Sequence, residues 1–376
     1  MKVSHNIDRL NYLIEMYKLS INEFLELISQ KLQNALTKED IFSNEIKVAH
    51  LKRIDKVFGK GIHYYLDPSP PIKNKNSSIF FRKNSFGENL NFEAKKVVEK
   101  YEKIKLSISA TQKIIGLKAN RKLANYTIKD IPKEVAKEVR KLLYPQFNKD
   151  KKFFLKSLIE KLSAYNIFVF EYIEHHNKSD KINIDGFFLK PNFIVVKRAK
   201  YFSREILTLA HELGHFLLNE EDSYSVNFSN QKLSEVEKWC WNFAHYFLMG
   251  NYADEFELLP NSSVSNDYNW AAIKNISTNT HISEKSLFTT LLLNNKISSA
   301  NYKKVSNEID AKIIAFEKEL KEKRKKEGGK GRAPKAINSP LYETLMRTAY
   351  YEGAVSEYDV IKNLNLETAK FEAFIE

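Results

Sequence analysis

The sequence contains a single cysteine, Cys240, and no run of about 18 or more apolar residues. One cysteine excludes an intrachain disulfide framework and fits a reducing compartment. The first residues do not show the pattern of a signal peptide. We therefore expect a cytoplasmic protein with no membrane-spanning segment. Because no motif surrounds Cys240, we expect it to pack in a core rather than to act as a nucleophile.

Hydrophobicity and charge limit the expected number of domains and the kinds of partner. Hydrophobic residues make up 43% of the 376 residues, so the chain can bury a substantial core in about two or three domains. An excess of Lys and Arg leaves a formal net charge of +13. This balance fits DNA or an acidic protein as a partner, and it fits equally well a lysine-rich surface that only faces solvent.

The pattern H-E-x-x-H occurs from His211 to His215, inside a stretch predicted to be helical. Positions four apart lie on the same face of a helix, so His211 and His215 can offer two imidazole nitrogens to one metal ion. Glu212 lies about 100° around the helix axis, where its carboxylate can reach a metal-bound water. Two histidines, a third protein ligand and an open position for water are the arrangement of a zinc hydrolase. The alternative is a buried helix whose histidines are only core polar groups.

The residues around this motif predict a core helix. Apolar side chains surround the motif on several sides: Leu207, Ala210, Leu213, Leu217 and Leu218. Gly214 has no side chain, so we expect another element to approach the helix closely there.

The third ligand must come from further along the chain, and Glu237 is the candidate. The chain between His215 and Glu237 is long enough for one helix to end and a second to begin. Glu235 competes with it as a ligand. The pattern Ser234-x-x-Glu237 is also typical of a capping box, in which the glutamate accepts a backbone hydrogen bond at a helix start. Spacing alone does not separate these alternatives.

The segment from Arg204 to Gly250 resembles the ImmA/IrrE family of metallopeptidases. The first block of that family, R-x-x-(F/I)-T-L-A-H-E-L-G-H-x-L-L, is similar to Arg204–Leu218. In its second block, E-x-x-A-N-x-F-A-x-x-L-L-M-P, the residues Phe243-Ala244 and Phe247-Leu248-Met249 fall in register. Two departures occur there: Cys240-Trp241 stands where Ala-Asn is usual, and Gly250 where Pro is usual.

This resemblance implies a fold and a ligand set. The register of the second block places Glu237, rather than Glu235, at the metal-binding glutamate of the family. The implied cofactor is Zn²⁺, held by His211, His215 and Glu237 in a zincin-like core. That core would consist of a small sheet, the H-E-x-x-H helix and a second helix that bears the third ligand.

The fold class that we expect is α+β and mostly helical. Strands are predicted at residues 167–173, 182–188 and 193–196, directly before the H-E-x-x-H helix, with a further strand-like segment at 78–82. Helices are predicted at 92–118 and at 131–163, the second broken near Pro145. His175-His176 lies in a loop, where we expect two surface histidines.

The N-terminal residues predict short helices. Ser20 is a predicted cap, and Gly59 a predicted helix end. The stretch is weakly similar to a Cro/repressor-type helix-turn-helix domain, although residues 30–46 are longer and less regular than its recognition helix. DNA binding and a module that only packs on the peptidase both remain open.

Four domains are expected along the chain. They are a helix-turn-helix-like domain at 1–72, a metallopeptidase domain at 78–255, a small helical segment at 256–305, and a C-terminal part at 306–376. The proline-rich stretch Asp67–Pro71 marks the first boundary. Residues 256–305 have the outline of a small helix-turn-helix, and an ordinary helical pair that supports the peptidase is the favoured alternative. The last part comprises a charged helix, a basic hinge at 327–334 and two closing helices.

A zinc peptidase mechanism follows from the implied ligands. The ion would lower the pKa of bound water, and Glu212 would accept the water proton and pass it to the leaving nitrogen. Arg204 is expected to be a salt-bridge partner rather than a catalytic group. Four side chains are candidates for steadying the oxyanion, and the sequence does not choose among them: His245, Tyr246, Tyr201 and Tyr224.

The function that we expect is that of a cytosolic, site-specific zinc endopeptidase. The family resemblance implies a repressor or antitoxin-type protein as substrate, encoded nearby, whose cleavage switches on a stress, mobile-element or phage-defence response. A second hypothesis is a DNA-binding transcriptional regulator that uses a peptidase-like fold as a sensor. A third is the partner-binding component of a toxin–antitoxin pair.

Overall fold

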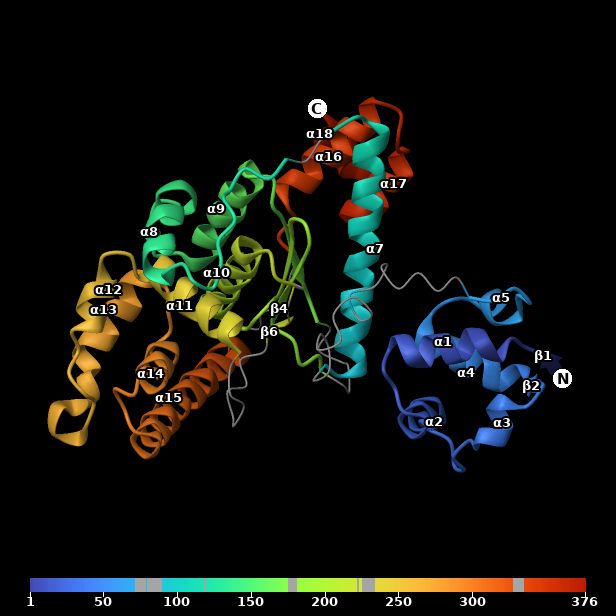
Figure 1. Cartoon of the computed structure of the whole chain (residues 1–376), viewed down its shortest axis with the longest axis horizontal. Coiled ribbons are helices and arrows are strands. Elements are labelled where there is room, and N and C mark those ends of the chain that lie inside the picture. Colours follow the sequence, from blue (N-terminus) through green and yellow to red (C-terminus); the bar gives the residue numbers. More distant parts are fainter. Residues whose placement is uncertain are drawn as a thin grey trace. The chain divides into compact units, whose positions relative to one another are not determined.

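The computed structural model describes residues 1–71, 79, 90–117, 120–174, 181–221, 223–224, 234–326 and 335–376. The chain forms two compact units, Met1–Glu102 and Lys103–Glu376. Both are mainly helical, and each contains a small sheet, so the predicted α+β class with a helical majority is confirmed (Figure 1). The domain boundaries predicted at 72, 255 and 305 stay predictions.

The first unit consists of short helices and one short two-stranded sheet. Its strands are antiparallel. The elements are β1 (Lys2–Ser4), α1 (Ile7–Met16), α2 (Ile21–Ser29), α3 (Lys38–Phe42), β2 (Glu45–Lys47), α4 (Val48–Phe58), α5 (Ile62–Leu66) and the first part of α7 (Phe92–Ile114).

Local sequence signals determine where these helices begin and end. Ser20 and Glu23 form a reciprocal capping box at the start of α2. Gly59 ends α4 in the left-handed conformation, with φ +62°. Both predicted signals are confirmed. The stretch 30–46, expected to be irregular, contains the five-residue helix α3, whose first turn carries two acidic residues.

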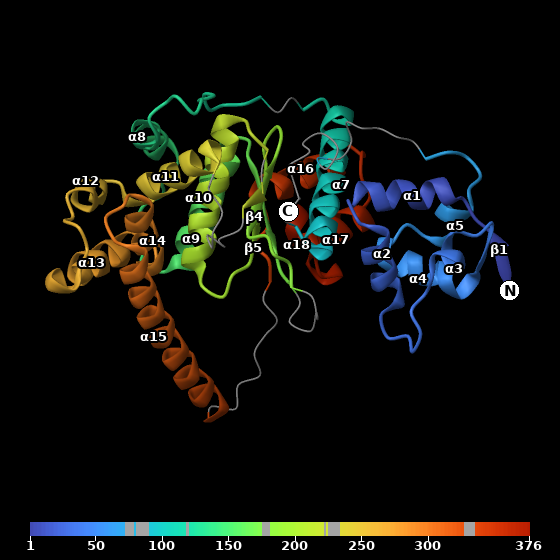
Figure 2. The same cartoon turned by 60° about the horizontal axis from the view of Figure 1, so that its bottom comes forward.

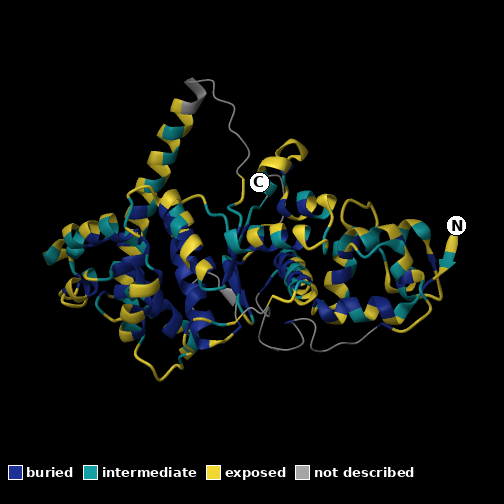
Figure 3. Ribbon diagram, turned by 90° about the horizontal axis from the view of Figure 1, so that it is seen from above, coloured by how far each residue is buried: buried dark blue, intermediate teal, exposed yellow. Residues whose placement is uncertain are grey.

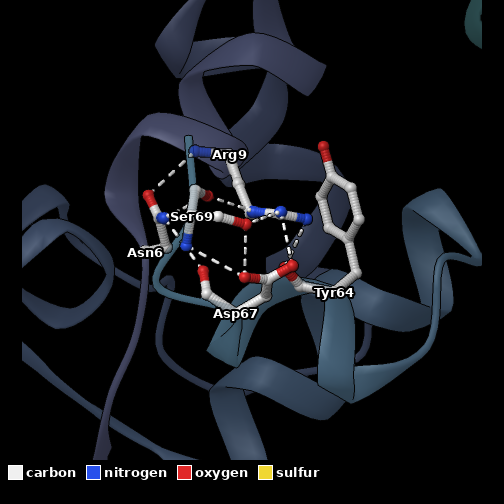
Figure 4. Close-up of polar contacts among 5 residues, drawn as sticks. All are labelled: Asn6, Arg9, Tyr64, Asp67 and Ser69. Atoms are coloured by element: carbon white, nitrogen blue, oxygen red, sulfur yellow. Dashed lines mark hydrogen bonds and ion pairs between the residues drawn. The ribbon is translucent and has the colours of Figure 1, made fainter. Parts of the chain in front are cut away.

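A polar network closes the first unit around Arg9 (Figure 4). The Arg9 guanidinium donates to the carboxylate of Asp67, to the backbone and hydroxyl oxygens of Ser69, and to the carbonyl oxygen of Tyr64. It also lies 4.9 Å from the centroid of the Tyr64 ring. Asn6 caps α1 and donates to the carbonyl oxygens of Asp67 and Ser69. The network therefore joins α1 to the end of α5.

The second unit contains most of the helices. They are the remainder of α7, α8 (Pro132–Leu143), α9 (Lys151–Ala164), α10 (Phe202–Leu218), α11 (Glu235–Met249), α12 (Tyr252–Glu257), α13 (Trp270–Thr280), α14 (Glu284–Leu293), α15 (Ser299–Lys326), α16 (Pro340–Tyr351), α17 (Glu357–Leu364) and α18 (Phe371–Ile375), with 3-10 turns η1 (Val264–Asn269) and η2 (Thr368–Lys370). The predicted helix 92–118 ends at Ile114, and the predicted break near Pro145 separates α8 from α9.

A four-stranded mixed sheet contains three strands that precede α10 in the chain and one that follows it. Its strands are β3 (Phe168–Tyr172), β4 (Gly186–Leu189), β5 (Phe193–Lys197) and β6 (Ser223–Tyr224), in the order β3-β5-β4-β6. Strand β5 is parallel to β3 and antiparallel to β4, and β6 is antiparallel to β4. The predicted strands 167–173 and 193–196 agree with β3 and β5. The segment 78–82, apart from the helical Ile79, and His175-His176 lie outside the described residues.

The prediction of a strand starting at Ile182 is wrong, because β4 begins at Gly186. Ile182 and Ile184 are buried at alternate positions, which imitates a strand. The backbone of Ile182 is instead satisfied by side chains: its N–H donates to Glu174, and its carbonyl oxygen accepts from Lys197. Hydrogen bonds to side chains thus replace the backbone hydrogen bonds to a neighbouring strand that a strand would form there.

The two faces of the sheet are covered by different helices (Figure 2). Val169, Ile194 and Val196 belong to the core that α9 and α10 share. On the opposite face, the ring of Phe170 stacks on Phe193 and contacts Tyr342 of α16. Buried residues concentrate in the sheet and its neighbouring helices, whereas the second half of α15 is mainly exposed (Figure 3). The ligand-bearing helix α10 therefore lies in the core of this unit.

The segment 256–305 packs on α11. The indole N–H of Trp241 donates to the hydroxyl of Thr290 over 3.2 Å, and His245 is hydrogen-bonded to Ser286 over 3.0 Å. Six consecutive residues of α14, from Ser286 to Leu291, are buried. These contacts support the favoured prediction of a helical pair that braces the peptidase helices. No helix among the described residues is long and apolar enough to span a membrane.

Candidate metal centre

Helix α10 carries the H-E-x-x-H motif and is buried along almost its whole length. At its first turn, Arg204 forms an ion pair of 2.7 Å with Asp185, which confirms the predicted salt bridge. At its last turn, Asn219 adopts the left-handed conformation, with φ +51°. The Arg121 guanidinium donates to the carbonyl oxygens of Phe216 and Leu217 there. A cation at this end also complements the helix dipole, so both ends of α10 are held in place.

Helix α11 carries the third candidate ligand and ends at Gly250. Arg140 of α8 donates to the carbonyl oxygens of Phe247 and Leu248. Gly250 has φ +55°, and a Cβ there would come within 2.6 Å of the Arg140 guanidinium. Proline cannot adopt this φ, so the glycine found where the family has proline accommodates the arginine. This departure from the family pattern has a local structural reason.

The two helices cross at Gly214 and Cys240. A Cβ on Gly214 would lie 3.1 Å from both Cα and Cβ of Cys240 and 3.2 Å from its Sγ. Gly214 therefore permits the close approach expected from the sequence. Cys240 is fully buried, as predicted. The crossing brings the start of α11 beside the two histidines of α10.

Three side chains converge at this crossing. Nε2 of His211 lies 3.2 Å from Nε2 of His215. The two carboxylate oxygens of Glu237 lie 3.1 Å from Nε2 of His211 and 3.0 Å from Nε2 of His215. All three residues offer a ligand atom within 4.8 Å of the other two.

The donor set fits zinc in both chemistry and spacing. Imidazole nitrogen and carboxylate oxygen are common zinc ligands, with bonds of about 2.0–2.2 Å. Tetrahedral coordination at that bond length separates the ligand atoms by about 3.3–3.5 Å. The separations of 3.0–3.2 Å between the ligand atoms of the cluster are slightly shorter. The three side chains would therefore need to move only slightly apart to hold the ion. His211, His215 and Glu237 are therefore able to hold Zn²⁺.

The structure brings Glu237, rather than Glu235, to the histidines. Glu235 is exposed at the start of α11. The predicted cap is also present, because the Ser234 hydroxyl accepts a hydrogen bond of 3.1 Å from the backbone N–H of Glu237. The two interpretations of Glu237 are thus compatible. Its backbone completes the cap, and its carboxylate points to the imidazoles.

Electrostatics favour a charged carboxylate in this cluster. Burial opposes the negative charge on Glu237, but the neighbouring His215 and His211 outweigh it and hold the pKa of the carboxyl well below its usual range. Burial likewise opposes a positive charge on His215, yet Cys240 and Glu237 raise its pKa well above the ordinary value. Burial also raises the pKa of the Cys240 thiol. Without a metal ion, the imidazoles and the carboxylate therefore stabilise one another.

Glu212 follows the first ligand and faces the sheet. Its side chain is fully buried. The backbone of Gly186, at the start of β4, lies beside it, and a Cβ there would come within 3.0 Å of Oε1 of Glu212. The general base predicted from the sequence thus lies in the core between α10 and β4.

Three of the four predicted oxyanion candidates have partners elsewhere. Nδ1–H of His245 donates to the carbonyl oxygen of Trp241 and Nε2 accepts from Ser286, while burial lowers the pKa of the imidazole to about 4. The hydroxyls of Tyr246 and Tyr201 donate to carboxylates over 2.8 Å each. For Tyr224 only the backbone is described. The oxyanion role stays a prediction for all four residues.

Three supporting residues were not singled out from the sequence. Arg121 and Arg140 cap the C-terminal ends of the two ligand helices, and Gly186 lies against Glu212. A glycine at the start of a buried strand is a signal of close approach that could have drawn attention to Gly186. The arginines act through contacts distant in sequence, which no local pattern reveals.

None of the curated proteins or solved structures compared with the chain gives a significant match. One family model does match, over residues 165–284, and it is described as the IrrE N-terminal-like domain of peptidase family M78. The match does not include the N-terminal residues, so the helix-turn-helix resemblance stays a prediction. The matched segment contains His211, Glu212, His215 and Glu237, and the resemblance of this part of the chain to the ImmA/IrrE metallopeptidases is confirmed.

Proposed function

We propose that the protein is a zinc-dependent endopeptidase whose centre comprises His211, His215, Glu237 and Glu212. The observation that carries this proposal is the convergence of three zinc-type donors within 3.2 Å of one another. The buried carboxylate of Glu212 belongs to α10, the helix that carries both histidines. The match to peptidase family M78 over this segment supports a metallopeptidase-like role.

Different residues of the centre would bind the metal, transfer the proton and hold the helices. Zinc held by the two imidazoles and Glu237 would supply Lewis acidity, which lowers the pKa of water and polarises the scissile carbonyl. Glu212 accepts the proton of the attacking water and passes it to the leaving nitrogen as the peptide bond breaks. Its burial excludes bulk water from this proton transfer. Arg121 and Arg140 donate to carbonyl oxygens at the C-terminal ends of the two helices and hold these ends in place.

The proposed substrate is a repressor or antitoxin-type protein, cleaved at one site in the cytosol. The family resemblance supports this class of substrate and a stress, mobile-element or phage-defence response. The net charge of +13 is compatible with an acidic partner protein. The partner is expected to be encoded beside this chain.

A direct test incubates the zinc-loaded protein with each co-encoded protein and identifies products by mass spectrometry. The wild type should produce one pair of fragments, and Glu212→Gln should produce none while keeping about one zinc per chain. Salt-dependent, sequence-selective DNA binding that survives Glu212→Gln, without any cleavage, would support the regulator hypothesis instead. A tight complex that forms without cleavage, whether or not zinc is present, would support the toxin–antitoxin hypothesis.

A further inference from the structure

We propose that Gly186 is a positioning residue for Glu212, because the absence of a side chain on β4 leaves the space that the catalytic carboxylate occupies. This inference rests on the proposed function for its kinetic consequence, but its structural part stands independently. It assigns a role in the reaction to a strand residue that is neither a metal ligand nor a proton carrier.

The contacts at Gly186 are unusually close. A Cβ built on its backbone would lie 3.0 Å from Oε1 and 3.1 Å from Cγ of Glu212, and 2.6 Å from Cγ2 of Thr208. Both neighbours belong to α10, one turn apart, so the glycine faces the helix between them. Because Cγ as well as Oε1 of Glu212 is in contact, rotating the carboxylate alone would not make room. An added methyl group must displace the Glu212 side chain or move the helix.

The backbone at Gly186 cannot retreat easily. Gly186 pairs with Val196 of β5 on one side and with Tyr224 of β6 on the other. The preceding residue, Asp185, is bound to α10 through Arg204 and accepts a hydrogen bond from the backbone of Lys197. Strand and helix are therefore held together on either side of the contact.

The neighbours on α10 cannot retreat easily either. Thr208 is 2% exposed and Glu212 0% exposed, so neither side chain can swing into solvent. The backbone of Gly186 is not in the left-handed region that only glycine favours. Alanine is thus compatible with the backbone, and its effect would arise from the new Cβ alone. In a strand without such contacts, Gly→Ala is neutral or stabilising.

A displaced Glu212 would impair proton transfer without removing the ligands. The three heavy atoms nearest to a Cβ at Gly186 belong to Thr208 and Glu212 and not to His211, His215 or Glu237. Contacts of 3.0–3.1 Å require Glu212 to move by a few tenths of an ångström, and a shift of about 1 Å in a catalytic group can reduce the rate about 100-fold. Gly186→Ala should therefore reduce kcat strongly and leave KM and zinc content close to the wild-type values.

The kinetic experiment separates the two contacts. Thr208→Ser removes the Cγ2 methyl group and with it the 2.6 Å contact, and alone it should leave kcat near that of the wild type. The decisive variant is Gly186→Ala/Thr208→Ser, assayed with an internally quenched peptide that spans the bond identified by mass spectrometry. We expect kcat to be reduced about 3- to 10-fold, with KM changed less than about twofold and one zinc retained. Wild-type kcat in this double variant, or loss of zinc together with activity, would overturn the proposal.

A second experiment needs no substrate and uses the metal-free full chain. Urea unfolding is compared for Thr208→Ser with and without Gly186→Ala, and then for the same pair in a Glu212→Ala background. We expect Gly186→Ala to lower the urea midpoint while Glu212 is present, and to leave it unchanged or raise it once Glu212 is shortened. An equal reduction in both backgrounds would show that Glu212 does not occupy the space beside Gly186. This result decides the contact even if no peptidase activity is found, so failure of the proposed function remains distinguishable.

Discussion

The two compact units differ in the partners that their buried polar side chains have. In Met1–Glu102, the Arg9 guanidinium meets one carboxylate, one hydroxyl and two carbonyl oxygens, so donors and acceptors are matched (Figure 4). In Lys103–Glu376, two imidazoles and a carboxylate direct their ligand atoms at one another, within 3.2 Å. The first arrangement is complete as it stands. The second brings together three side chains whose ligand atoms could hold a metal ion.

This difference separates polar groups that hold the fold from polar groups that act. A matched network stabilises by exchanging water hydrogen bonds for internal ones, and its removal affects only stability. In a cluster of metal-type donors on two buried helices, the charges of His215 and Glu237 favour each other, but burying ionisable groups is costly. Its donor types match those of a zinc site. The comparison can be tested by disturbing each arrangement and measuring activity and stability separately.

The largest effect should come from Glu212→Gln in the second unit. The amide keeps the shape of the side chain but cannot accept the proton of the attacking water, so kcat should fall by a factor of about 10²–10⁴. Zinc content, measured by atomic absorption, should stay near one per chain, and the thermal unfolding curve should change little. A variant that retains activity would show that Glu212 is not the general base of the reaction.

The next effect concerns the metal itself, and Glu235 provides a matched control for Glu237. Zinc at about 100 times its Kd stabilises a native state by about 2.7 kcal/mol, which corresponds to a rise in Tm of roughly 5–10 °C for a unit of this size. Wild type and Glu235→Ala should both show this rise in scanning fluorimetry. Glu237→Ala should lose most of it. The same zinc response in both variants would show that Glu237 is not a ligand.

Much of the centre could be predicted from the sequence because its geometry is local. The four-residue spacing of His211 and His215 determines their shared face once α10 is a helix. The spacing did not decide between Glu235 and Glu237, and only the register of the second family block favoured Glu237. Capping signals such as Ser20 and Gly59 were also readable, since each acts within one helix turn.

The parts that could not be predicted depend on contacts between distant segments. Ile182 and Ile184 alternate as a strand would, yet Glu174 and Lys197 satisfy the backbone of Ile182 from outside the segment. The roles of Arg140 and Gly186 require knowing which helix or strand lies opposite each residue. Periodicity reports which face of an element is buried, but it does not report the partner of that face.

A third prediction concerns a buried pair of carboxyl groups at the other end of α10. Burial raises the pKa of Glu205 far above 4.5, and its neighbour Glu171 raises it further. Arg198 pairs with Glu171, whose carboxylate also accepts the backbone N–H of Ile337. The native state therefore retains a proton on Glu205 at a pH where the unfolded chain has lost it. The associated stability is fully present below about pH 4.5 and is lost as pH rises towards the native pKa.

Glu205→Gln should remove this dependence. The amide can accept from Ala199, as the carboxyl does, and can donate to Glu171 without titrating. Between about pH 5 and pH 8, the free energy of unfolding should fall less steeply in the variant than in the wild type, by an amount on the order of 1–3 kcal/mol. Urea unfolding at several pH values measures the difference. Parallel profiles would mean that Glu205 is ionised in the native protein.

The smallest effect should come from the first unit, where Arg9→Lys tests whether its network is only structural. Lysine keeps the charge but loses the planar fork that reaches Asp67 and Ser69 together. We expect the free energy of unfolding of Met1–Glu102 to fall by about 1–2 kcal/mol, with zinc binding and kcat unchanged. Lys335→Met provides the control, because its ion pair with Glu367 has side chains that are 81% and 59% exposed and such pairs contribute about 0–1 kcal/mol. If Arg9→Lys changed kcat while the unfolding curve stayed the same, the first unit would contribute to the reaction, and the separation between a structural unit and an active unit would no longer hold.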